Sequence, residues 1–333
     1  MKFSLIICTY QRPEALLKLL NSVQLQSLYP DQILIVDGST NLETQNTLER
    51  NPFKQLEYFP VNSENRGLTK QRNLGIQKVA EASEIVCFLD DDIILTSDYF
   101  KNLIGTYSKI PDALGVGGYI LDEVQWKRNS VGKSVQFDEF EMYGYIRKLG
   151  SRNVLRKKLG LLSDQPPGFM PEFSNGLSIG FLPSSDKTYP VEFFMGGVSS
   201  YRKELFEKIS FSPYFEGYGL YEDMDFCLRA SKLGQLYVNT AAQLYHYHEE
   251  SGRPNQFNYG KMVVRNGWYV WRVKYPKPKF KAQVKWHSIA FLLTLVRIGN
   301  VINTDRKKEA FTESLGRISG WWSLIYNQPK ILK

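Results

Sequence analysis

Three consecutive aspartates, Asp90, Asp91 and Asp92, directly follow an apolar run at residues 85–89. When a buried strand ends in acids, the carboxylates lie at the sheet edge where parallel α/β sheets bind their ligands. Adjacent carboxylates repel one another, and a divalent cation offsets that repulsion. Such hard oxygen ligands suit Mg²⁺ or Mn²⁺ bridging phosphate oxygens. The alternative is a solvated acidic turn, and the preceding apolar run makes us favour the metal site.

Further polar residues follow the other apolar runs. Thr9, Tyr10 and Arg12 stand just before Pro13, where the start of a helix would offer free backbone amides to an anion. Asp37 follows a second apolar run, and Arg72 lies in a polar stretch at the start of another expected helix. These residue types are suited to phosphate or base contacts. Because no GxGxxG or GxxxxGK[ST] pattern is present, the common dinucleotide and P-loop solutions are not expected.

A second acidic group, Glu222 and Asp223, stands at the start of an expected helix downstream of the pair Gly196-Gly197. Adjacent glycines let the backbone approach a ligand closely. His246 and His248 follow on one face of an expected strand. Acids at a helix start also act as ordinary dipole partners, and paired histidines are often surface residues. We favour a site role because these features occur together.

Short apolar runs alternate with helical patterns over the first 120 residues. This alternation predicts an α/β fold, with a mostly parallel sheet flanked by helices. The expected strands cover residues 3–8, 32–37, 56–60, 84–90 and 113–121. The expected helices cover residues 13–27, 41–49 and 69–82.

Periodicity is poor over residues 122–190, which we expect to form loops and short strands. Regular structure is expected again from residue 193. Helices are expected at residues 202–208, 221–233, 256–274 and 283–302, and short strands at 236–239 and 243–248. The predicted organisation is a domain over residues 1–252 in two halves (1–121 and 122–252), followed by a helical extension (253–333).

Composition excludes several classes of protein. The 333 residues are 43% hydrophobic and 23% charged, which is ordinary for a globular chain and not for a disordered or collagen-like one. Three scattered cysteines favour a reduced, cytoplasmic protein over a disulfide scaffold. The apolar run at residues 3–8 is too short for a signal peptide, and that at 286–296 is below the roughly 20 residues of a membrane span.

The net charge of +8 is distributed unevenly. Residues 253–333 contain 16 Lys or Arg and three Asp or Glu, a net charge of +13, so residues 1–252 carry −5. A basic tail with an apolar helix at 283–302 predicts contact with an anionic membrane surface. The alternatives are packing of that helix on the catalytic domain and a homodimer interface. A basic nucleic-acid binder is not expected, because no nucleic-acid-binding signature accompanies the patch.

In their order and spacing, these segments resemble the family 2 glycosyltransferases of the GT-A fold, particularly the bacterial cell-envelope type. The resemblance covers about the first 275 residues. It implies that residues 1–121 are the nucleotide-sugar-binding half and residues 122–252 the acceptor half of a catalytic domain. It depends on the segments around Thr9, Asp37, Arg72, Asp90–Asp92, Gly196-Gly197, Glu222-Asp223 and Arg265-Asn266. The chain lacks the QxxRW pattern and membrane helices of processive synthases, so single-sugar transfer is expected.

The resemblance implies a role for each matching residue. Nucleotide-sugar binding is implied for Thr9, Tyr10, Arg12, Asp37, Arg72, Asp90, Asp91, Gly196 and Gly197. Asp92 matches the metal ligand of the DxD motif, with His246, or alternatively His248, as a further contact to Mn²⁺ or Mg²⁺. Asp223 matches the catalytic base, with Glu222 beside it.

The expected reaction is one inverting displacement, in which a nucleotide-diphosphate sugar glycosylates a glycan or a lipid-linked glycan. The expected location is the cytoplasm, including the inner face of the cytoplasmic membrane as a peripheral protein. The competing enzyme is a nucleotidyltransferase on a similar sheet. That class usually has a glycine-rich loop after its first strand, and residues 9–13 contain no glycine.

Overall fold

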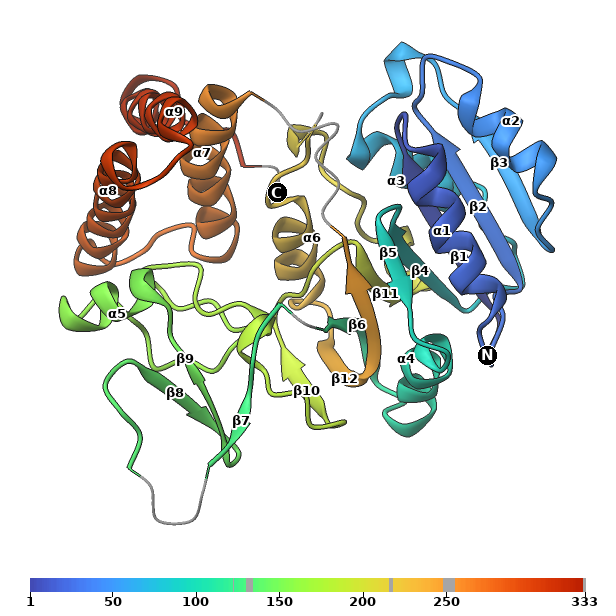
Figure 1. Cartoon of the computed structure of the whole chain (residues 1–333), viewed down its shortest axis with the longest axis horizontal. Coiled ribbons are helices and arrows are strands. Elements are labelled where there is room, and N and C mark those ends of the chain that lie inside the picture. Colours follow the sequence, from blue (N-terminus) through green and yellow to red (C-terminus); the bar gives the residue numbers. More distant parts are fainter. Residues whose placement is uncertain (122, 130–133, 216–217, 248–254, 332–333) are drawn as a thin grey trace. The chain divides into compact units, whose positions relative to one another are not determined.

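The computed structural model describes residues 1–121, 123–129, 134–215, 218–247 and 255–331. By packing, the chain divides into two compact units (Figure 1). The first contains Met1–Glu123 and Ser184–Gly252, and the second Val124–Pro183 and Arg253–Lys333. The division into a domain 1–252 and an extension 253–333 stays a prediction.

The first unit is built on one sheet with the strand order β10-β12-β6-β11-β4-β1-β2-β3, and β5 pairs with β12. Its first strands are β1 (Phe3–Thr9), β2 (Gln32–Asp37), β3 (Leu56–Pro60), β4 (Ile85–Asp90) and β5 (Ile93–Leu95). The later strands are β6 (Ala113–Ile120), β10 (Thr188–Val191), β11 (Val198–Arg202) and β12 (Gln235–His246).

The predicted α/β fold is confirmed, and the sheet is mixed. Strands β1, β2, β3 and β4 pair in parallel, as do β6 and β12. Strands β5, β10 and β11 run antiparallel to their neighbours. Strands β1, β2 and β4 are buried on both faces, which explains why their sequences form near-continuous apolar runs.

Helices cover both faces of this sheet. Gly75 of α3 lies against Ile6 and Val36, so α3 packs on the face that these side chains share. The alternate residues Leu5 and Ile7 belong to the core on the opposite face, together with residues of α1 and α4. The helices of this unit are α1 (Pro13–Gln24), α2 (Glu43–Arg50), α3 (Leu68–Gln77), α4 (Tyr99–Lys109) and α6 (Glu222–Ala230). Short 3-10 helices are η1 (Ser63–Asn65), η3 (Lys203–Glu207) and η4 (Pro213–Phe215).

Three local expectations for this unit are corrected. The two short strands expected at 236–239 and 243–248 form one strand, β12, whose pairing with β6 shifts register between Val238 and Gln243. The helix expected at 202–208 is the 3-10 helix η3. Helix α4 and strand β5 are additional to the predicted elements.

The second unit contains a small antiparallel sheet and a group of helices. Its strands β7 (Lys127–Arg128), β8 (Glu139–Met142) and β9 (Tyr145–Lys148) have the order β7-β9-β8. Its helices are α5 (Ser151–Lys158), η2 (Ile179–Phe181), α7 (Gln256–Lys274), α8 (Phe280–Asn303) and α9 (Lys307–Tyr326). Helix α7 has the predicted bounds, α8 is longer than predicted, and α9 is additional.

Candidate functional site

The three aspartates after β4 have different surroundings. Asp91 is 4% exposed, and its two carboxylate oxygens accept hydrogen bonds from Thr9 Oγ1 (2.7 Å) and Arg12 Nη1 (3.0 Å). Burial raises the pKa of Asp91 to about 6, while Arg12 and Thr9 act to lower it. The Asp90 side chain is 44% exposed, whereas that of Asp92 is 8% exposed. Asp91 therefore holds the turn after β4 in place through its two hydrogen bonds, and Asp90 and Asp92 flank it in the sequence.

Asp92 pairs with His246, which strand pairing brings to it. His246 lies opposite Ile93 in the β5–β12 pair, and the Tyr247 backbone N–H donates to the Asp92 carbonyl oxygen at 3.0 Å. His246 Nε2 is 3.2 Å from Asp92 Oδ1, and Nδ1 is 3.7 Å from Glu123 Oε1. Burial acts to lower the pKa of His246, but hydrogen bonds to Asp92 and Glu123 raise it to about 10. The predicted alternative His248 lies outside the described residues.

The donor set of Asp92 and His246 has the chemistry of a divalent-cation site. Carboxylate oxygen and imidazole nitrogen are both ligands of Mn²⁺. Two donors about 2.1 Å from one cation, at neighbouring octahedral corners, lie roughly 3 Å apart, which is close to the observed 3.2 Å. Among the described residues, no three His, Cys, Asp or Glu side chains form a ready cluster. The pair fits a cation that takes further ligands from a bound molecule.

Arg72 of α3 contacts both Asp90 and Glu222. Glu222 lies 150 positions after Arg72 in the sequence. It is 2% exposed, with Nη1 2.6 Å from Glu222 Oε1 and Nη2 3.5 Å from Asp90 Oδ1. Its guanidinium also lies over the rings of Phe88 and Phe211. Burial raises the pKa of Glu222 to about 8, although Arg72 acts to lower it. The second carboxylate oxygen of Glu222 is buried without a hydrogen-bond partner.

Asp223 stands in the first turn of α6. Its Oδ2 accepts from the Gly196 backbone N–H at 3.2 Å, and its Oδ1 accepts from the Met224 N–H at 2.7 Å. Burial raises the pKa of Asp223 from its ordinary value, while the hydrogen bonds from the two backbone amides act to lower it. Tyr221, the residue before the helix, has φ +71°, a left-handed conformation that costs energy and occurs often at functional sites. Asp223 is thus a carboxylate held by backbone amides.

The pair Gly196-Gly197 allows the backbone to lie against these acids. A Cβ at position 196 would stand 2.7 Å from both Arg72 Nη1 and Glu222 Oε1. A Cβ at position 197 would stand 2.0 Å from Asp90 Oδ2. Glycine is therefore required sterically at both positions, given these carboxylate positions.

Asp37 is also held by the protein. Its Oδ1 accepts from the Ser39 backbone N–H at 2.8 Å and from Ser39 Oγ at 2.5 Å, and its Oδ2 accepts from the Tyr58 hydroxyl at 2.8 Å. Tyr10 is 39% exposed, with the Arg66 guanidinium 5.8 Å from its ring centroid. An exposed aromatic ring next to a cation can stack on a planar group such as a nucleobase.

The predicted residues form two connected groups. One contains Thr9, Arg12, Asp91, Asp92 and His246, and the other contains Arg72, Asp90, Gly196, Gly197, Glu222 and Asp223. Asp37 and Tyr10 are outside both groups in the contacts described above. Two partners were missed, Tyr58 on Asp37 and Glu123 on His246. Tyr58 lies in an expected strand beside Asp37, whereas Glu123 falls in a segment without periodicity.

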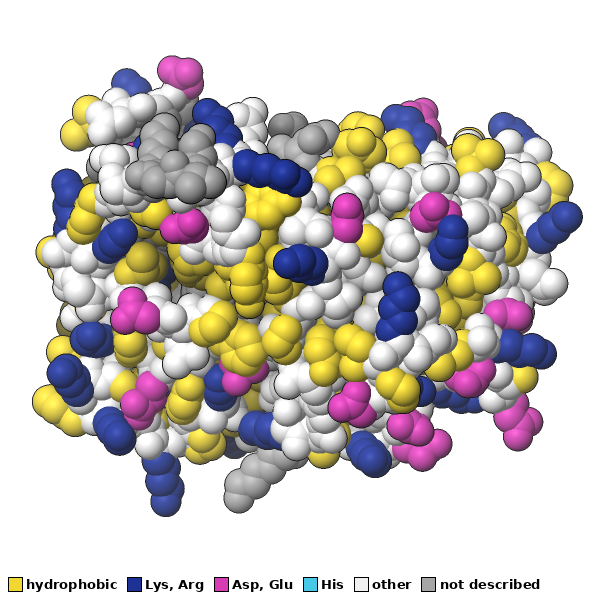
Figure 2. Space-filling view, turned by 90° about the horizontal axis from the view of Figure 1, so that it is seen from below, with side chains coloured by type: hydrophobic (Ala, Val, Ile, Leu, Met, Phe, Trp, Pro, Cys, Tyr) yellow, Lys and Arg dark blue, Asp and Glu magenta, His cyan; other side chains and the backbone are white. Residues whose placement is uncertain are grey.

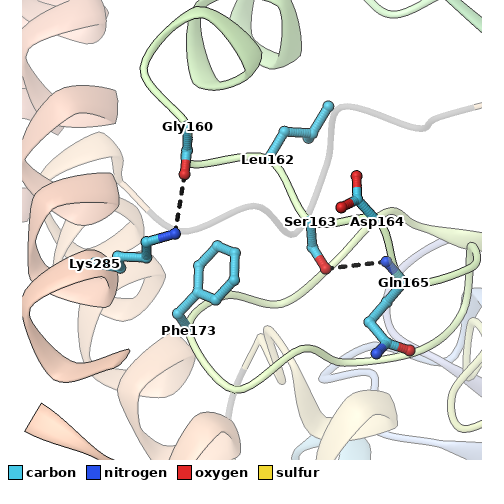
Figure 3. Close-up of a pocket in the computed structure, with 7 residues that line it drawn as sticks. All are labelled: Gly160, Leu162, Ser163, Asp164, Gln165, Phe173 and Lys285. Atoms are coloured by element: carbon cyan, nitrogen blue, oxygen red, sulfur yellow. Dashed lines mark hydrogen bonds between the residues drawn. The ribbon is translucent and has the colours of Figure 1, made fainter. Parts of the chain in front are cut away.

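A hollow of about 530 Å³ lies within the second unit (Figure 3). Lys285 of α8 donates from Nζ to the Gly160 carbonyl oxygen at 3.1 Å and lies over the Phe173 ring at 4.5 Å. The other residues around it are Leu162, Ser163, Asp164 and Gln165. None of the residues predicted for the site is among them.

Comparisons with known proteins agree with the fold and the motifs. The sequence profile described as "Glycosyl transferase family 2" matches residues 4–210. Glucosyl-dolichyl phosphate glucuronosyltransferase of Haloferax volcanii is 30% identical over 151 residues, which are 44% of this chain and 45% of that protein. O-antigen chain rhamnosyltransferase RfbN of Salmonella typhimurium is 30% identical over 108 residues, 32% of this chain and 34% of that protein.

A solved structure shares the fold. It is described as "Crystal structure of GalNAc-T7 with UDP, GalNAc and Mn2+", and it matches with a TM-score of 0.53 at 14% identity, covering 99% of this chain and 59% of that chain. At this identity the likeness concerns the fold alone. The matched segments span less than half the length of either curated relative.

Proposed function

Because this chain belongs to glycosyl transferase family 2, we propose that it transfers one sugar from a nucleotide-diphosphate donor to a hydroxyl group of an acceptor. The observation that carries the proposal is the Asp223 carboxylate, which two backbone amides orient in a site with Arg72 and Asp90. The raised pKa of Asp223 makes it a stronger base than an exposed aspartate. We propose that Asp223 acts as the base that removes the proton from the acceptor hydroxyl.

The proposed reaction is a single displacement with inversion at the anomeric carbon. Asp223 takes the proton of the acceptor hydroxyl while that oxygen attacks the sugar opposite the leaving diphosphate. Glu222 accepts a hydrogen bond from Arg72 and so fixes its position, and Arg72 also contacts Asp90. We propose that Asp90 faces the donor. Tyr10 is proposed to stack on the base, with Asp37 and Thr9 shaping the walls of that subsite.

Asp92 and His246 are the residues that would hold a divalent cation, Mn²⁺ or Mg²⁺, in this proposal. Such a cation neutralises the diphosphate and makes it a better leaving group. The chain's own contribution is to keep the Asp92 carboxylate fixed between His246 and Arg12.

The acceptor class is proposed from the names of the relatives. One is named for a dolichyl phosphate-linked glucose and the other for an O-antigen chain, so a glycan or lipid-linked glycan in cell-surface polysaccharide or glycolipid assembly is the favoured acceptor. Lipid-linked acceptors lie at a membrane surface, so a cytoplasmic protein at the inner membrane face is part of this proposal.

The experiment that tests the proposal is the substitution Asp223→Asn. Nucleotide affinity is expected to stay within about threefold of wild type, while turnover falls by about 10² or more, because a general base acts in the transition state. Binding is measured by calorimetry and turnover by release of nucleoside diphosphate from a panel of nucleotide sugars. The exposed Asp186→Asn is the matched control and is expected to behave as wild type. Normal turnover in Asp223→Asn would reject Asp223 as the base.

A further inference from the structure

Helix α8 presents an apolar stripe to solvent. Six large apolar residues on it are between 41% and 81% exposed, and their spacing of three, four or seven places them on one side of the helix. They are Phe280, Val284, Phe291, Leu295, Ile298 and Ile302. On the other side of the helix, Trp286 and Ile289 are buried. Helix α8 is therefore apolar on its inner side as well as on the exposed stripe.

Helix α9 presents a second stripe of the same kind. Its apolar residues recur at intervals of three and four, and they are between 39% and 77% exposed. They are Phe311, Leu315, Ile318, Trp322, Ile325 and Tyr326. Contiguous exposed apolar patches of this extent are uncommon on soluble monomers and usually mark an interaction surface.

The inward side of α9 is mostly polar or small, and Leu324 is the one large apolar residue among its buried positions. This largely reverses the usual amphipathic pattern. Glu313 is 5% exposed and pairs with Arg317 at 2.7 Å, and it also pairs with Arg297 of α8 at 2.7 Å. Gly316 and Gly320 lie against the backbone of α7, where added Cβ atoms would clash. Charged and small residues inside with large apolar residues outside is the arrangement of a helix whose outer surroundings are apolar.

The two stripes turn to the same side of one helical hairpin. Trp321 Nε1 donates to His287 Nδ1 at 3.1 Å, and Arg297 pairs with Glu313, so residues early in α8 meet residues late in α9. The helices are therefore antiparallel. Successive residues of an α-helix are about 100° apart around its axis. On each helix, the centre of the apolar stripe lies roughly 100° around the axis, in the direction of increasing residue number, from the side that faces the other helix. Because the helices run in opposite directions, equal rotations bring both stripes to one side.

Cations stand at both ends of the hairpin. Lys277, Lys279 and Lys281 are exposed at the start of α8, and Lys307 and Lys308 are exposed at the start of α9. Residues 253–333 carry a net charge of +13. Figure 2 shows one face of the molecule, on which hydrophobic side chains lie beside Lys and Arg side chains. The residues of the hairpin surface are identified by their exposed fractions. A partner for this hairpin must accept apolar side chains in its centre and positive charge around it.

We propose that the α8–α9 hairpin is a docking surface for an anionic membrane, with the two stripes inserted at the level of the lipid headgroups. Among the residues that the structure describes, no helix combines the length and hydropathy needed to cross a bilayer. A surface-bound pair of helices satisfies that limit and matches both the apolar and the basic features. A second copy of this chain is the less favourable occupant, because a two-fold interface would bring two strongly positive regions together.

The test measures binding of the 333-residue chain to phosphatidylcholine vesicles with and without 30% phosphatidylglycerol, by co-sedimentation at low and high salt. Wild type is expected to bind the anionic vesicles at least tenfold more tightly than the neutral ones and to lose affinity as salt increases. The double variant Phe291→Ser/Trp322→Ser is expected to lose at least tenfold in vesicle affinity. The charge variant Lys307→Glu/Lys308→Glu is expected to lose at least tenfold as well.

Matched controls distinguish binding through this surface from nonspecific binding through exposed apolar or charged side chains elsewhere. Leu25→Ser/Leu42→Ser removes apolar side chains that are 77% and 66% exposed in the first unit, and Lys54→Glu/Lys109→Glu reverses two exposed charges there. Both are expected to bind as wild type, and all variants to keep the wild-type melting temperature. The proposal would be overturned if wild type bound neutral and anionic vesicles equally, or if the control variants lost as much vesicle affinity as the test variants. It would also be overturned if wild type bound no vesicles and instead formed a dimer that Phe291→Ser/Trp322→Ser disrupted. Because the readout is binding, its failure is independent of whether sugar transfer occurs.

Discussion

Asp91 and Glu222 are both buried carboxylates, but their partners give them different properties. Both oxygens of Asp91 are hydrogen-bonded, to Thr9 and Arg12, whereas one oxygen of Glu222 is bonded to Arg72 and the other has no hydrogen-bond partner. An unsatisfied buried polar atom costs about 1–3 kcal/mol. Such a cost is expected at a site whose groups are arranged for a ligand and not for stability alone. Asp91 supports the turn, whereas Glu222 keeps one buried oxygen without a hydrogen-bond partner.

At the same scale, Asp92→Ala is expected to abolish the thermal stabilisation that Mn²⁺ adds to a bound nucleoside diphosphate. The reason is that Asp92 supplies the carboxylate oxygen beside His246. The measurement is the melting temperature with nucleotide, with and without Mn²⁺. Asp138→Ala, at a side chain 49% exposed in the second unit, is the control and is expected to keep the full shift. A wild-type Mn²⁺ shift in Asp92→Ala would refute the assignment.

Glu222 should make stability fall with rising pH. Its pKa in the folded chain, about 8, lies above its ordinary value of 4.5, so the folded state binds more protons than the unfolded state between these pH values. Its contribution to the free energy of unfolding is therefore fully present below pH 4.5 and is lost as the pH rises toward 8. The expected loss is on the order of a few kcal/mol.

The measurement is urea unfolding at pH 5 and pH 8 in a metal chelator, for wild type and Glu222→Gln. The variant is expected to show a smaller decrease between the two pH values than wild type, whatever its absolute stability. The exposed Glu49→Gln should keep the wild-type decrease. Parallel pH profiles for wild type and Glu222→Gln would show that Glu222 does not titrate in this window.

At the scale of elements, helices α7 and α9 cross at backbone contact. A Cβ at Gly316 would stand 2.0 Å from the Phe257 carbonyl oxygen, and a Cβ at Gly260 would stand 2.1 Å from the Glu313 carbonyl oxygen. Backbone atoms cannot rotate away as a flexible side chain can. This crossing therefore depends on glycine on both helices.

Gly316→Ala is accordingly expected to destabilise the chain by about 1–3 kcal/mol, because the helices must separate. Gly299→Ala in α8 is the control, since an added Cβ there meets nothing within 4 Å. The control is expected to be neutral or to stabilise by up to about 1 kcal/mol, as alanine favours helix over glycine. Both are measured as free energies of unfolding in urea. A neutral Gly316→Ala would mean that the crossing is looser than the structure shows.

Sequence patterns predicted several strands of the first unit but missed helix α9, because the two differ in the residues that they bury. Strands β1, β2 and β4 were predicted within about one residue, because their buried residues form near-continuous apolar runs. Strand β3 also has its predicted bounds, although none of its residues is buried. Helix α9 has no such signature. Its buried side consists mostly of small and charged residues, with Leu324 as the one large apolar residue, and most of its large apolar side chains are exposed. A search for an apolar core face does not find a helix built in that way.

The candidate site shows a similar limit. Carboxylates after strand ends were identifiable because strand and acid are adjacent in sequence. The pairing of Arg72 with Glu222 across 150 positions was not identifiable from sequence patterns. The grouping of Asp92 with His246 was expected only from the family resemblance, with His248 as the alternative, and in the structure His246 meets Asp92 through the pairing of β5 with β12. Those contacts depend on the path of the chain between the strands, which periodicity does not report.

At the scale of the whole molecule, each compact unit is made from two separate stretches of chain. In the second unit, Trp271 Nε1 donates to the Glu172 carbonyl oxygen at 2.7 Å, and Tyr275 donates from its hydroxyl to the Met170 carbonyl oxygen at 2.8 Å. Residues 124–183 therefore depend on residues 253–333 for part of their packing. A cut at residue 252, where composition predicts a boundary, would divide this unit.

A chain ending at residue 252 is thus expected to expose residues 160–183 to proteolysis. Residues 160–183 contain no Lys or Arg but several Phe and Leu residues, so chymotrypsin is the suitable protease. Limited chymotrypsin digestion with mass spectrometry should show cleavage in this segment at least tenfold faster than in the 333-residue chain. Cleavage within residues 1–121 should proceed at similar rates in both. Equal protection of residues 160–183 in the two chains would support the predicted boundary at 252 instead.

The pairing of β5 with β12 finally limits how this chain can tolerate insertions and deletions. His246 meets Asp92 because it lies opposite Ile93, with tyrosine on either side of it. One residue added within 243–246 would bring Tyr245 opposite Ile93, replacing the imidazole with a phenol and reversing every side chain beyond it. At residues 239–242 the pairing is already irregular, so an added residue there can be absorbed. Relatives that keep this histidine are therefore expected to differ in length at 239–242 and not at 243–246.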